Sequence, residues 1–131
     1  MISTILDAPR PIIIDRPYTD EAILALKAEI KARPIRTSDY TLCKITYATR
    51  DMQGCVAFYG DPSVRPIKIT GGLTAGYGGT GPHGTVEALK LLGFRLTEAV
   101  EDLVYSKAPV DDAEVYRLQV RKEKGGVTTS F

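Results

Sequence analysis

A glycine-rich stretch restricts where regular structure can form in this chain. Seven of the fourteen residues from Gly71 to Gly84 are glycine, and glycine loses more backbone entropy on ordering than any other residue. Strands and helices are therefore expected to end before this stretch or to begin behind it. Residues 41–70 alternate between apolar and polar side chains as strands do, whereas residues 85–105 have the spacing of helices.

Short strands are predicted on both sides of the glycine-rich stretch. Thr41–Thr49 places Cys43, Ile45 and Tyr47 on one face. Turn residues then separate this segment from Cys55–Tyr59 and from Val64–Thr70, which suggests an antiparallel meander. A late segment, Val115–Lys122, alternates again and predicts one more strand.

Three segments have helical periodicity. Asp20–Arg33 follows Thr19, a predicted N-cap, and ends at Pro34. Thr85–Leu92 precedes Gly93, which suits a helix C-terminus, and Thr97 is predicted to cap a helix through Tyr105. The expected fold class is α+β: an antiparallel sheet of about four to five strands, an N-terminal helix, and two consecutive helices after the glycine-rich loop.

The length of 131 residues indicates a single domain, 1–131. Residues 1–18 contain three prolines around an apolar run and are predicted to be an extended arm or an edge strand. The tail, 125–131, is predicted to be frayed. Cys43 and Cys55 are interpreted as buried free thiols, although the sequence leaves their pairing open.

The composition argues against some classes of binding partner. The chain is 44% hydrophobic and 25% charged with a net charge of +1, so no bulk field attracts it to a nucleic-acid polymer or a membrane. It has no apolar run of membrane-spanning length, and its first residues lack the pattern of a signal peptide. We therefore expect a cytoplasmic protein.

The glycine-rich loop is the predicted ligand site. Gly76–Gly81 matches G-x-G-x-x-G, but the following segments do not continue as the βαβ unit of a dinucleotide fold, and the lysine of a phosphate-binding P-loop is absent. What remains is a backbone able to approach a phosphate or nucleobase, beside a helix start that favours anions. Two other interpretations stay open: a subunit-interface loop and an ordinary flexible surface loop.

The predicted ligand-binding residues combine stacking, backbone approach, hydroxyls and cations. Tyr77 would stack on a base, and two arginines at strand ends would clamp a phosphate, with Lys68 and Thr70 on the same lining. The full predicted set is Tyr77, Gly78, Gly79, Thr80, Gly81, His83, Gly84, Thr85, Arg50 and Arg65.

Catalysis is the less favoured interpretation. His83 is the single histidine, and it is either an acid–base group or an exposed loop residue. No motif of paired carboxylates or clustered metal ligands accompanies it, so neither a cofactor nor a metal site is predicted.

Residues 76–85, Gly-Tyr-Gly-Gly-Thr-Gly-Pro-His-Gly-Thr, followed by Val86–Gly93, resemble small phage anti-defence proteins. The anti-Thoeris sponge family is the most similar, in outline over residues 40–105. This resemblance implies capture of cyclic ADP-ribose-type signals or cyclic oligonucleotides without turnover, in the cytoplasm of a phage host. It carries over no individual binding residue.

The sequence thus predicts a non-catalytic protein that captures a phosphate-bearing nucleotide under the glycine-rich loop. A pocket of this kind in a small chain is often built between subunits, so a homo-oligomer of two or more copies is expected. The alternatives are a small hydrolase or transferase that uses His83 on a phosphorylated or glycosidic bond, and an oligomeric interaction protein.

Overall fold

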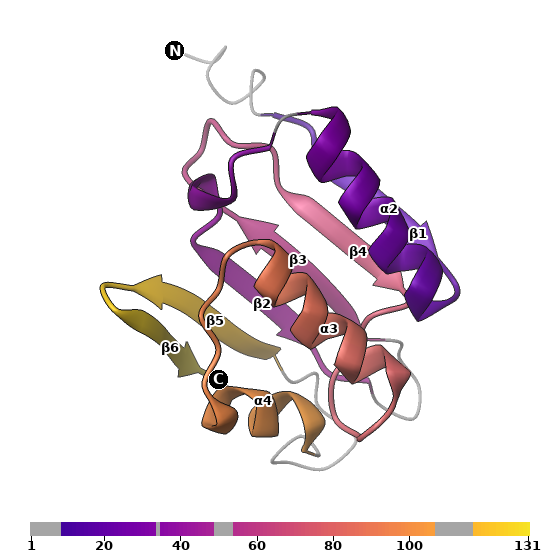
Figure 1. Ribbon diagram of the computed structural model, residues 1–131, viewed down its shortest axis with the longest axis vertical. Helices are drawn as coiled ribbons and strands as arrows, with labels where there is room; N and C mark the ends of the chain where they lie inside the picture. Colours follow the sequence, from indigo (N-terminus) through magenta and orange to yellow (C-terminus); the bar gives the residue numbers. More distant parts are fainter. Residues whose placement is uncertain (1–8, 34, 49–53, 107–116) are drawn as a thin grey trace.

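A single six-stranded sheet forms the centre of the protein (Figure 1). The computed structural model describes residues 9–33, 35–48, 54–106 and 117–131. The strand order is β1-β4-β3-β2-β5-β6. The α+β class is confirmed, but the expectation of four to five antiparallel strands is wrong, because the sheet has six strands and is mixed.

The strands are short, and those in the middle of the sheet follow the apolar alternation of the sequence. Their core faces carry residues such as Ile45, Phe58 and Ile69, which are fully buried. The bounds are β1 Ile12–Arg16, β2 Leu42–Thr46, β3 Cys55–Tyr59, β4 Ile67–Gly71, β5 Arg117–Glu123 and β6 Gly126–Ser130.

The parallel pair lies at one edge of the sheet. β1 pairs with β4 in parallel, with Ile12 opposite Ile67 and Ile14 opposite Ile69. Of the two alternatives for the N-terminal segment, residues 12–16 therefore form the edge strand. A meander pattern cannot reveal this pairing, because it joins residues 55 positions apart in the chain.

The opposite edge is the hairpin of β5 and β6. Val120 pairs with Thr129 and Glu123 with Gly126, and Gly125 turns the chain with a φ of 88°. The prediction of a frayed tail is wrong over residues 126–130. Threonine and valine favour strands, and β5 offers them an open edge.

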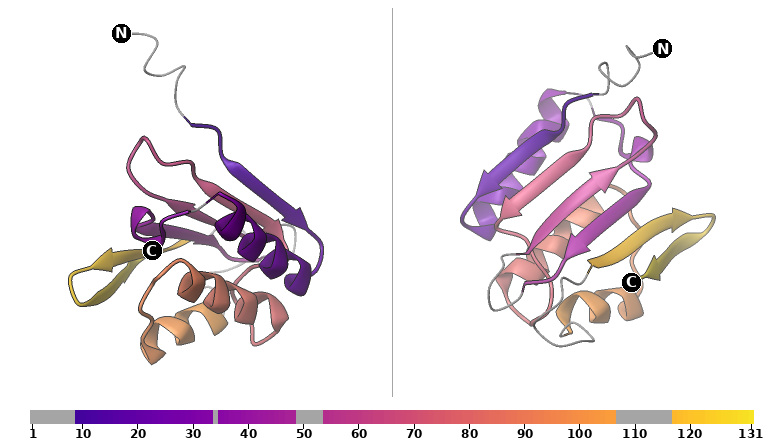
Figure 2. Two further views of the ribbon diagram at one scale, coloured as in Figure 1. Left: turned by 45° about the horizontal axis from the view of Figure 1, so that its top comes forward. Right: turned by 180° about the vertical axis from the view of Figure 1, so that it is seen from behind.

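All the described α-helices cover the same face of the sheet (Figures 1 and 2). They are α2 Thr19–Ala32, α3 Thr80–Leu91 and α4 Glu98–Tyr105, with a 3₁₀ turn at Thr37–Asp39. None of them is long and apolar enough to cross a membrane. The second view in Figure 2 shows the other face of the sheet with no described helix in front of it.

Two helix starts differ from the predictions. Thr19 is the first residue of α2 and not its cap, because its hydroxyl donates to Gly72 O at 2.7 Å. Helix α3 begins at Thr80, five residues before the predicted start, since Pro82 falls in the first turn, where its missing N–H costs no hydrogen bond. Thr97 caps α4 as predicted by accepting from Val100 N.

The two cysteines cannot form a disulfide in this fold. Cys43 pairs with Phe58, and Cys55 pairs with Thr46. Partners in register share a face, so Cys43 points into the helix-covered core and Cys55 toward the open face. Both thiols are free, and only Cys43 is buried.

Candidate functional site

Most glycines of the predicted loop have a packing or backbone role. Gly71 and Gly76 have positive φ angles of 95° and 110°, which other residues adopt at a cost. A Cβ atom at Gly84 would lie 2.4 Å from Thr19 Cγ2, and one at Gly81 would lie 2.7 Å from Thr74 Cγ2. Among the glycines of the loop, only Gly78 has open space where a Cβ would lie. The glycines therefore serve mainly to let the loop and α3 pack closely, and less to make the loop flexible.

The exposed part of the loop is its tip, Tyr77–Thr80. The Tyr77 side chain is 50% exposed. A Cβ at Gly79 would lie 2.5 Å from its ring, and one at Gly81 would lie 2.9 Å from its hydroxyl. The ring thus lies across the backbone at the start of α3. It would have to swing outward to stack on a ligand bound at that helix start.

Thr85 holds the loop against the helix. Its side chain is fully buried, and its hydroxyl lies 2.5 Å from Thr74 O and 3.2 Å from Gly81 O. The predicted ligand contact by this hydroxyl is therefore not available in the structure. The hydroxyl instead ties the first turn of α3 to the strand-side half of the loop.

A cleft of about 700 Å³ lies among α2, α3 and α4. The glycine-rich segment contributes three of its lining residues, Thr80, His83 and Gly84. The remaining lining residues lie beyond this segment, on α2, on the rest of α3 and on α4: Thr19, Asp20, Ile23, Val86, Glu87, Lys90, Glu101 and Tyr105. Its volume lies within the range of small-molecule sites.

His83 and Tyr105 form a pair on the wall of this cleft. The Tyr105 hydroxyl is 3.0 Å from His83 Nδ1, and the ring centroids are 4.8 Å apart. Burial, and after it the negative charge of Glu101, raise the pKa of Tyr105. The phenol and the imidazole thus share one hydrogen bond on the wall of the cleft.

The charge of the cleft is negative. Among the described lining residues, Asp20, Glu87 and Glu101 are acidic and Lys90 is the one lysine or arginine; its Nζ lies 4.0 Å from Glu101 Oε1. Carboxylates accept hydrogen bonds from hydroxyl and amino groups, and they repel a polyphosphate. This lining favours a ligand rich in donors over a highly charged anion.

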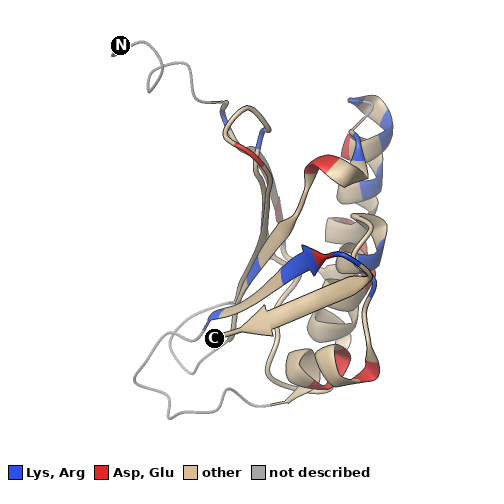
Figure 3. Ribbon diagram, turned by 90° about the vertical axis from the view of Figure 1, so that its left-hand side faces the viewer, with Lys and Arg blue, Asp and Glu red and all other residues tan. Residues whose placement is uncertain are grey.

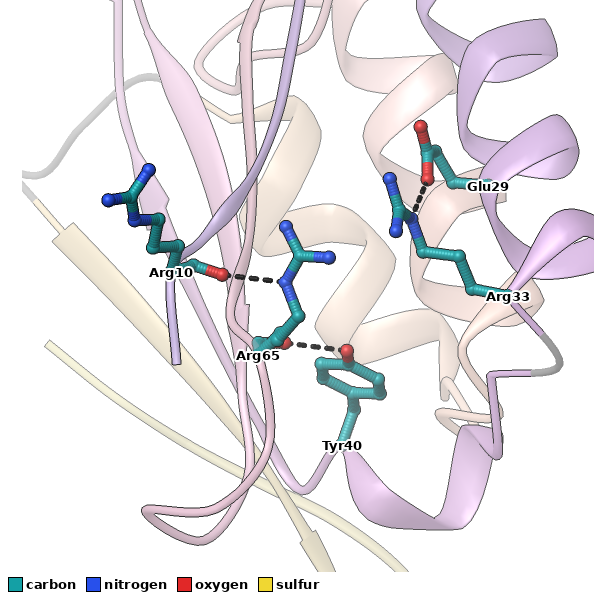
Figure 4. Close-up of polar contacts among 5 residues, drawn as sticks. All are labelled: Arg10, Glu29, Arg33, Tyr40 and Arg65. Carbon is teal, nitrogen blue, oxygen red and sulfur yellow. Dashed lines mark hydrogen bonds and ion pairs between the residues drawn. The ribbon is translucent and has the colours of Figure 1, made fainter. Parts of the chain in front are cut away.

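Of the two arginines of the predicted clamp, Arg65 does not lie at the glycine-rich loop. Arg50 lies outside the described residues. Arg65 precedes β4, whereas the loop begins at Gly71 at the other end of that strand. Figure 4 shows the Arg65 Nε donating to Arg10 O at 2.7 Å, while Tyr40 Oη donates to Arg65 O at 2.6 Å.

Arg65 faces a separate cavity of about 360 Å³. Arg33 and Arg36 also line it, but so do Asp39 and Asp61. Arg33, the C-cap residue of α2, is paired with Glu29 of that helix (Figure 4). Carboxylates thus offset most of the positive charge, and this cavity is a weaker anion site than the arginine count suggests.

Sequence reasoning missed the cleft residues Glu101 and Tyr105. They are four residues apart, so they share one face of α4, a spacing visible in the sequence. Which helix this face adjoins was not visible, because α3 and α4 meet only in the folded chain. In the described residues, no group of three or more histidine, cysteine, aspartate or glutamate side chains is placed to hold a metal ion.

Comparisons with protein-family models, with curated proteins and with solved structures found no match.

Proposed function

We propose that this protein binds, without turnover, a ribose-bearing nucleotide of low charge in the cleft among α2, α3 and α4. The observation that carries the proposal is the composition of that cleft. An aromatic pair, three carboxylates and a helix start surround a volume suited to a nucleotide.

The lining and the neighbouring loop tip offer a partner for each part of a nucleotide. Glu87 and Glu101 would accept hydrogen bonds from ribose hydroxyls or an exocyclic amine. The Thr80 amide, which has no carbonyl partner within α3, would receive one phosphate at the helix start. Tyr77, at the exposed loop tip, would cover the base after swinging away from the helix start.

The negative charge of the cleft lining favours ligands with few phosphate charges. A monophosphate or a cyclic diester carries one or two charges and fits the helix start at Thr80. A triphosphate adds charge that the three carboxylates repel. The resemblance to nucleotide sponges adds cyclic ADP-ribose derivatives to the ligands worth testing.

The first experiment is a thermal-shift screen with adenosine, AMP, ATP, cyclic dinucleotides and ADP-ribose derivatives. A ligand at about 100 times its dissociation constant stabilises the folded state by about 2.7 kcal/mol. Shifts for AMP or a cyclic nucleotide that exceed the shift for ATP support the proposal. An equal or larger shift for ATP, or no shift with any of these ligands, contradicts it.

Variants then locate the site. Glu101→Gln removes a charged acceptor from the cleft and is expected to weaken binding about 10-fold to 100-fold, from the 1.5–3 kcal/mol of a charged hydrogen bond. Glu98→Gln is the matched control, because Glu98 lies on the same helix, is exposed and does not line the cleft. Equal effects of both variants would exclude the cleft.

A second candidate function follows from the His83–Tyr105 pair. An imidazole held by a phenol, in one cleft with two glutamates, has the groups needed for acid–base hydrolysis of a phosphorylated or glycosidic bond. Ligand released by heat and analysed by mass spectrometry separates the two functions. Intact ligand supports capture, whereas product that His83→Ala abolishes supports an enzyme.

A further inference from the structure

The face of the sheet that no described helix covers carries a cluster of cations. In register across the strands, Lys68 of β4 and Lys44 of β2 flank Ala57 of β3. Arg117 and Arg121 of β5 pair with Thr46 and Leu42 of β2, and therefore point to the same side. Figure 3 shows lysine and arginine positions along the strands of the sheet.

Three of these cations line a hollow of about 300 Å³. Lys44, Lys68 and Arg117 surround it, and none of the described residues that line it is aspartate or glutamate. Within the described chain, no carboxylate forms an ion pair with any of the three. The hydroxyls of Thr46 and Thr70 add polar groups to the lining.

Two acidic residues of the described chain, Asp15 and Glu123, lie at the margins of this face, and both have hydrogen-bond partners. Asp15, on edge strand β1, accepts a hydrogen bond from Thr70 at 3.0 Å. Glu123, at the end of β5, accepts one from Thr128 at 3.3 Å. The middle of the face is thus positive, whereas the cleft on the helix side is negative. The charges of the two surfaces largely cancel in the net charge of +1, so the net charge reveals neither surface.

We propose that this open face binds single-stranded nucleic acid through its phosphates. Strands in a sheet are about 4.8 Å apart, so the backbones at Lys68 and Lys44, two strands apart, are separated by about 10 Å. Arg121 extends the positive surface along β5 beyond the hollow. A flexible polyanion reaches several of these cations at once, whereas a mononucleotide reaches only those around the small hollow.

The chemistry favours contact with the backbone of the strand over sequence recognition. Tyr59 is the aromatic residue in the hollow, and the Lys44 Nζ lies 5.4 Å from its ring centroid. Stacking platforms for bases normally use several exposed rings. Binding is therefore expected to depend strongly on salt and little on sequence.

The test measures fluorescence anisotropy of a labelled single-stranded DNA of about ten nucleotides, a length within the span of small single-strand-binding domains. The full chain is titrated at several salt concentrations. Lys44→Gln/Lys68→Gln removes two cations from the open face. Lys27→Gln/Lys31→Gln is the matched control, because it removes the same charge from exposed positions on α2, on the other side of the sheet.

The proposal expects the open-face variant to weaken binding at least 10-fold and to reduce the slope of log affinity against log salt by about 1.4, at about 0.7 per phosphate contact. The control variant should leave the slope unchanged. A thermal melt of each variant establishes that it is folded. An excess of AMP should not displace the oligonucleotide at concentrations where unlabelled single strand does.

Three results overturn the proposal: no binding at low salt, equal weakening in the control variant, or displacement by AMP as effective as by unlabelled strand. The last result would assign the hollow to a small phosphate ligand. None of these outcomes bears on the cleft among the helices, because its test uses Glu101 and different ligands.

Discussion

Substitution of Gly84 by alanine tests whether the glycines of the loop serve packing. In an exposed helix interior this change stabilises a protein by roughly 1 kcal/mol, because alanine has the higher helix propensity. Here the new methyl group would lie 2.4 Å from Thr19 Cγ2 and 2.6 Å from Leu73 Cδ2. Leu73 is fully buried, and the hydroxyl of Thr19 is bonded to Gly72 O. Movement of Leu73 would disturb the packed core, and movement of Thr19 would break its hydrogen bond to Gly72.

Packing is expected to outweigh propensity. Excess volume in a packed site costs typically 1–3 kcal/mol, and two contacts this short place Gly84→Ala near the upper end. After the propensity gain, the net loss of unfolding free energy is about 1–2 kcal/mol. With an unfolding entropy of about 2.1 cal/mol/K per residue, 1 kcal/mol corresponds to about 3.6 °C in this chain. The melting temperature should fall by about 4–7 °C.

Differential scanning calorimetry at neutral pH measures this shift, with Gly78→Ala as the control. Gly78 has open space where a Cβ would lie and does not have a positive φ. Its variant should therefore remain within about 0.5 kcal/mol of the wild type. A Gly84→Ala protein as stable as the wild type would refute the packing argument. The loop glycines would then need another explanation, such as close approach to a ligand.

Three further predictions concern the core and the edges of the sheet. Tyr47 is buried, its hydroxyl donates to Leu103 O, and burial raises its pKa to about 12. The phenol of Tyr47 ionises at a lower pH in the unfolded chain than in the folded protein. The free energy of unfolding that Tyr47 contributes below about pH 10 should therefore be lost as the pH rises toward 12. Urea titrations should find a smaller loss in Tyr47→Phe. A thiol reagent should label Cys55 in the native protein and Cys43 only after unfolding, since burial shields Cys43 and raises its pKa; simultaneous native labelling would contradict the assigned faces. Deletion of residues 1–17 should abolish the cooperative melt, because it removes β1 with its buried Ile12 and Ile14; a smaller oligomer that keeps a sharp transition would instead favour an arm for subunit contacts.

Local patterns were sufficient to predict the middle of the fold. The alternation around Ile45 and Phe58 identified β2 and β3, because one face of each strand packs on the core. Thr97 and Gly93 marked helix ends through backbone rules that act over a few residues. These signals are contained within single turns or strands, so they can be read without the rest of the chain.

Long-range partners explain what the sequence did not reveal. The pairing of β1 with β4 and the addition of β6 to β5 depend on edges that exist only after the sheet has formed. Thr19 is a favourable N-cap residue by type, yet its hydroxyl bonds to Gly72, 53 positions away. Tertiary contacts here override local preference.

The candidate site was predicted only in part for the same reason. Thr80, His83 and Gly84 line the cleft as members of the predicted set, but Thr85 is buried and Arg65 belongs to another cavity. A glycine-rich segment has the same composition whether it approaches a ligand or a neighbouring helix. Only the neighbours of each glycine distinguish the two cases.

The position of β2 in the sheet has a consequence for synthesis on the ribosome. Strands β1 to β4 lie within residues 12–71, but the second neighbour of β2 is β5. Leu42 can therefore pair with Arg121 only after the ribosome has added residue 121. Until then one edge of β2 presents unpaired N–H and C=O groups to any strand nearby. Translation adds about 5–20 residues per second, which leaves this edge open for several seconds. A nascent chain stalled before residue 117 should therefore be more prone to aggregate than the finished protein.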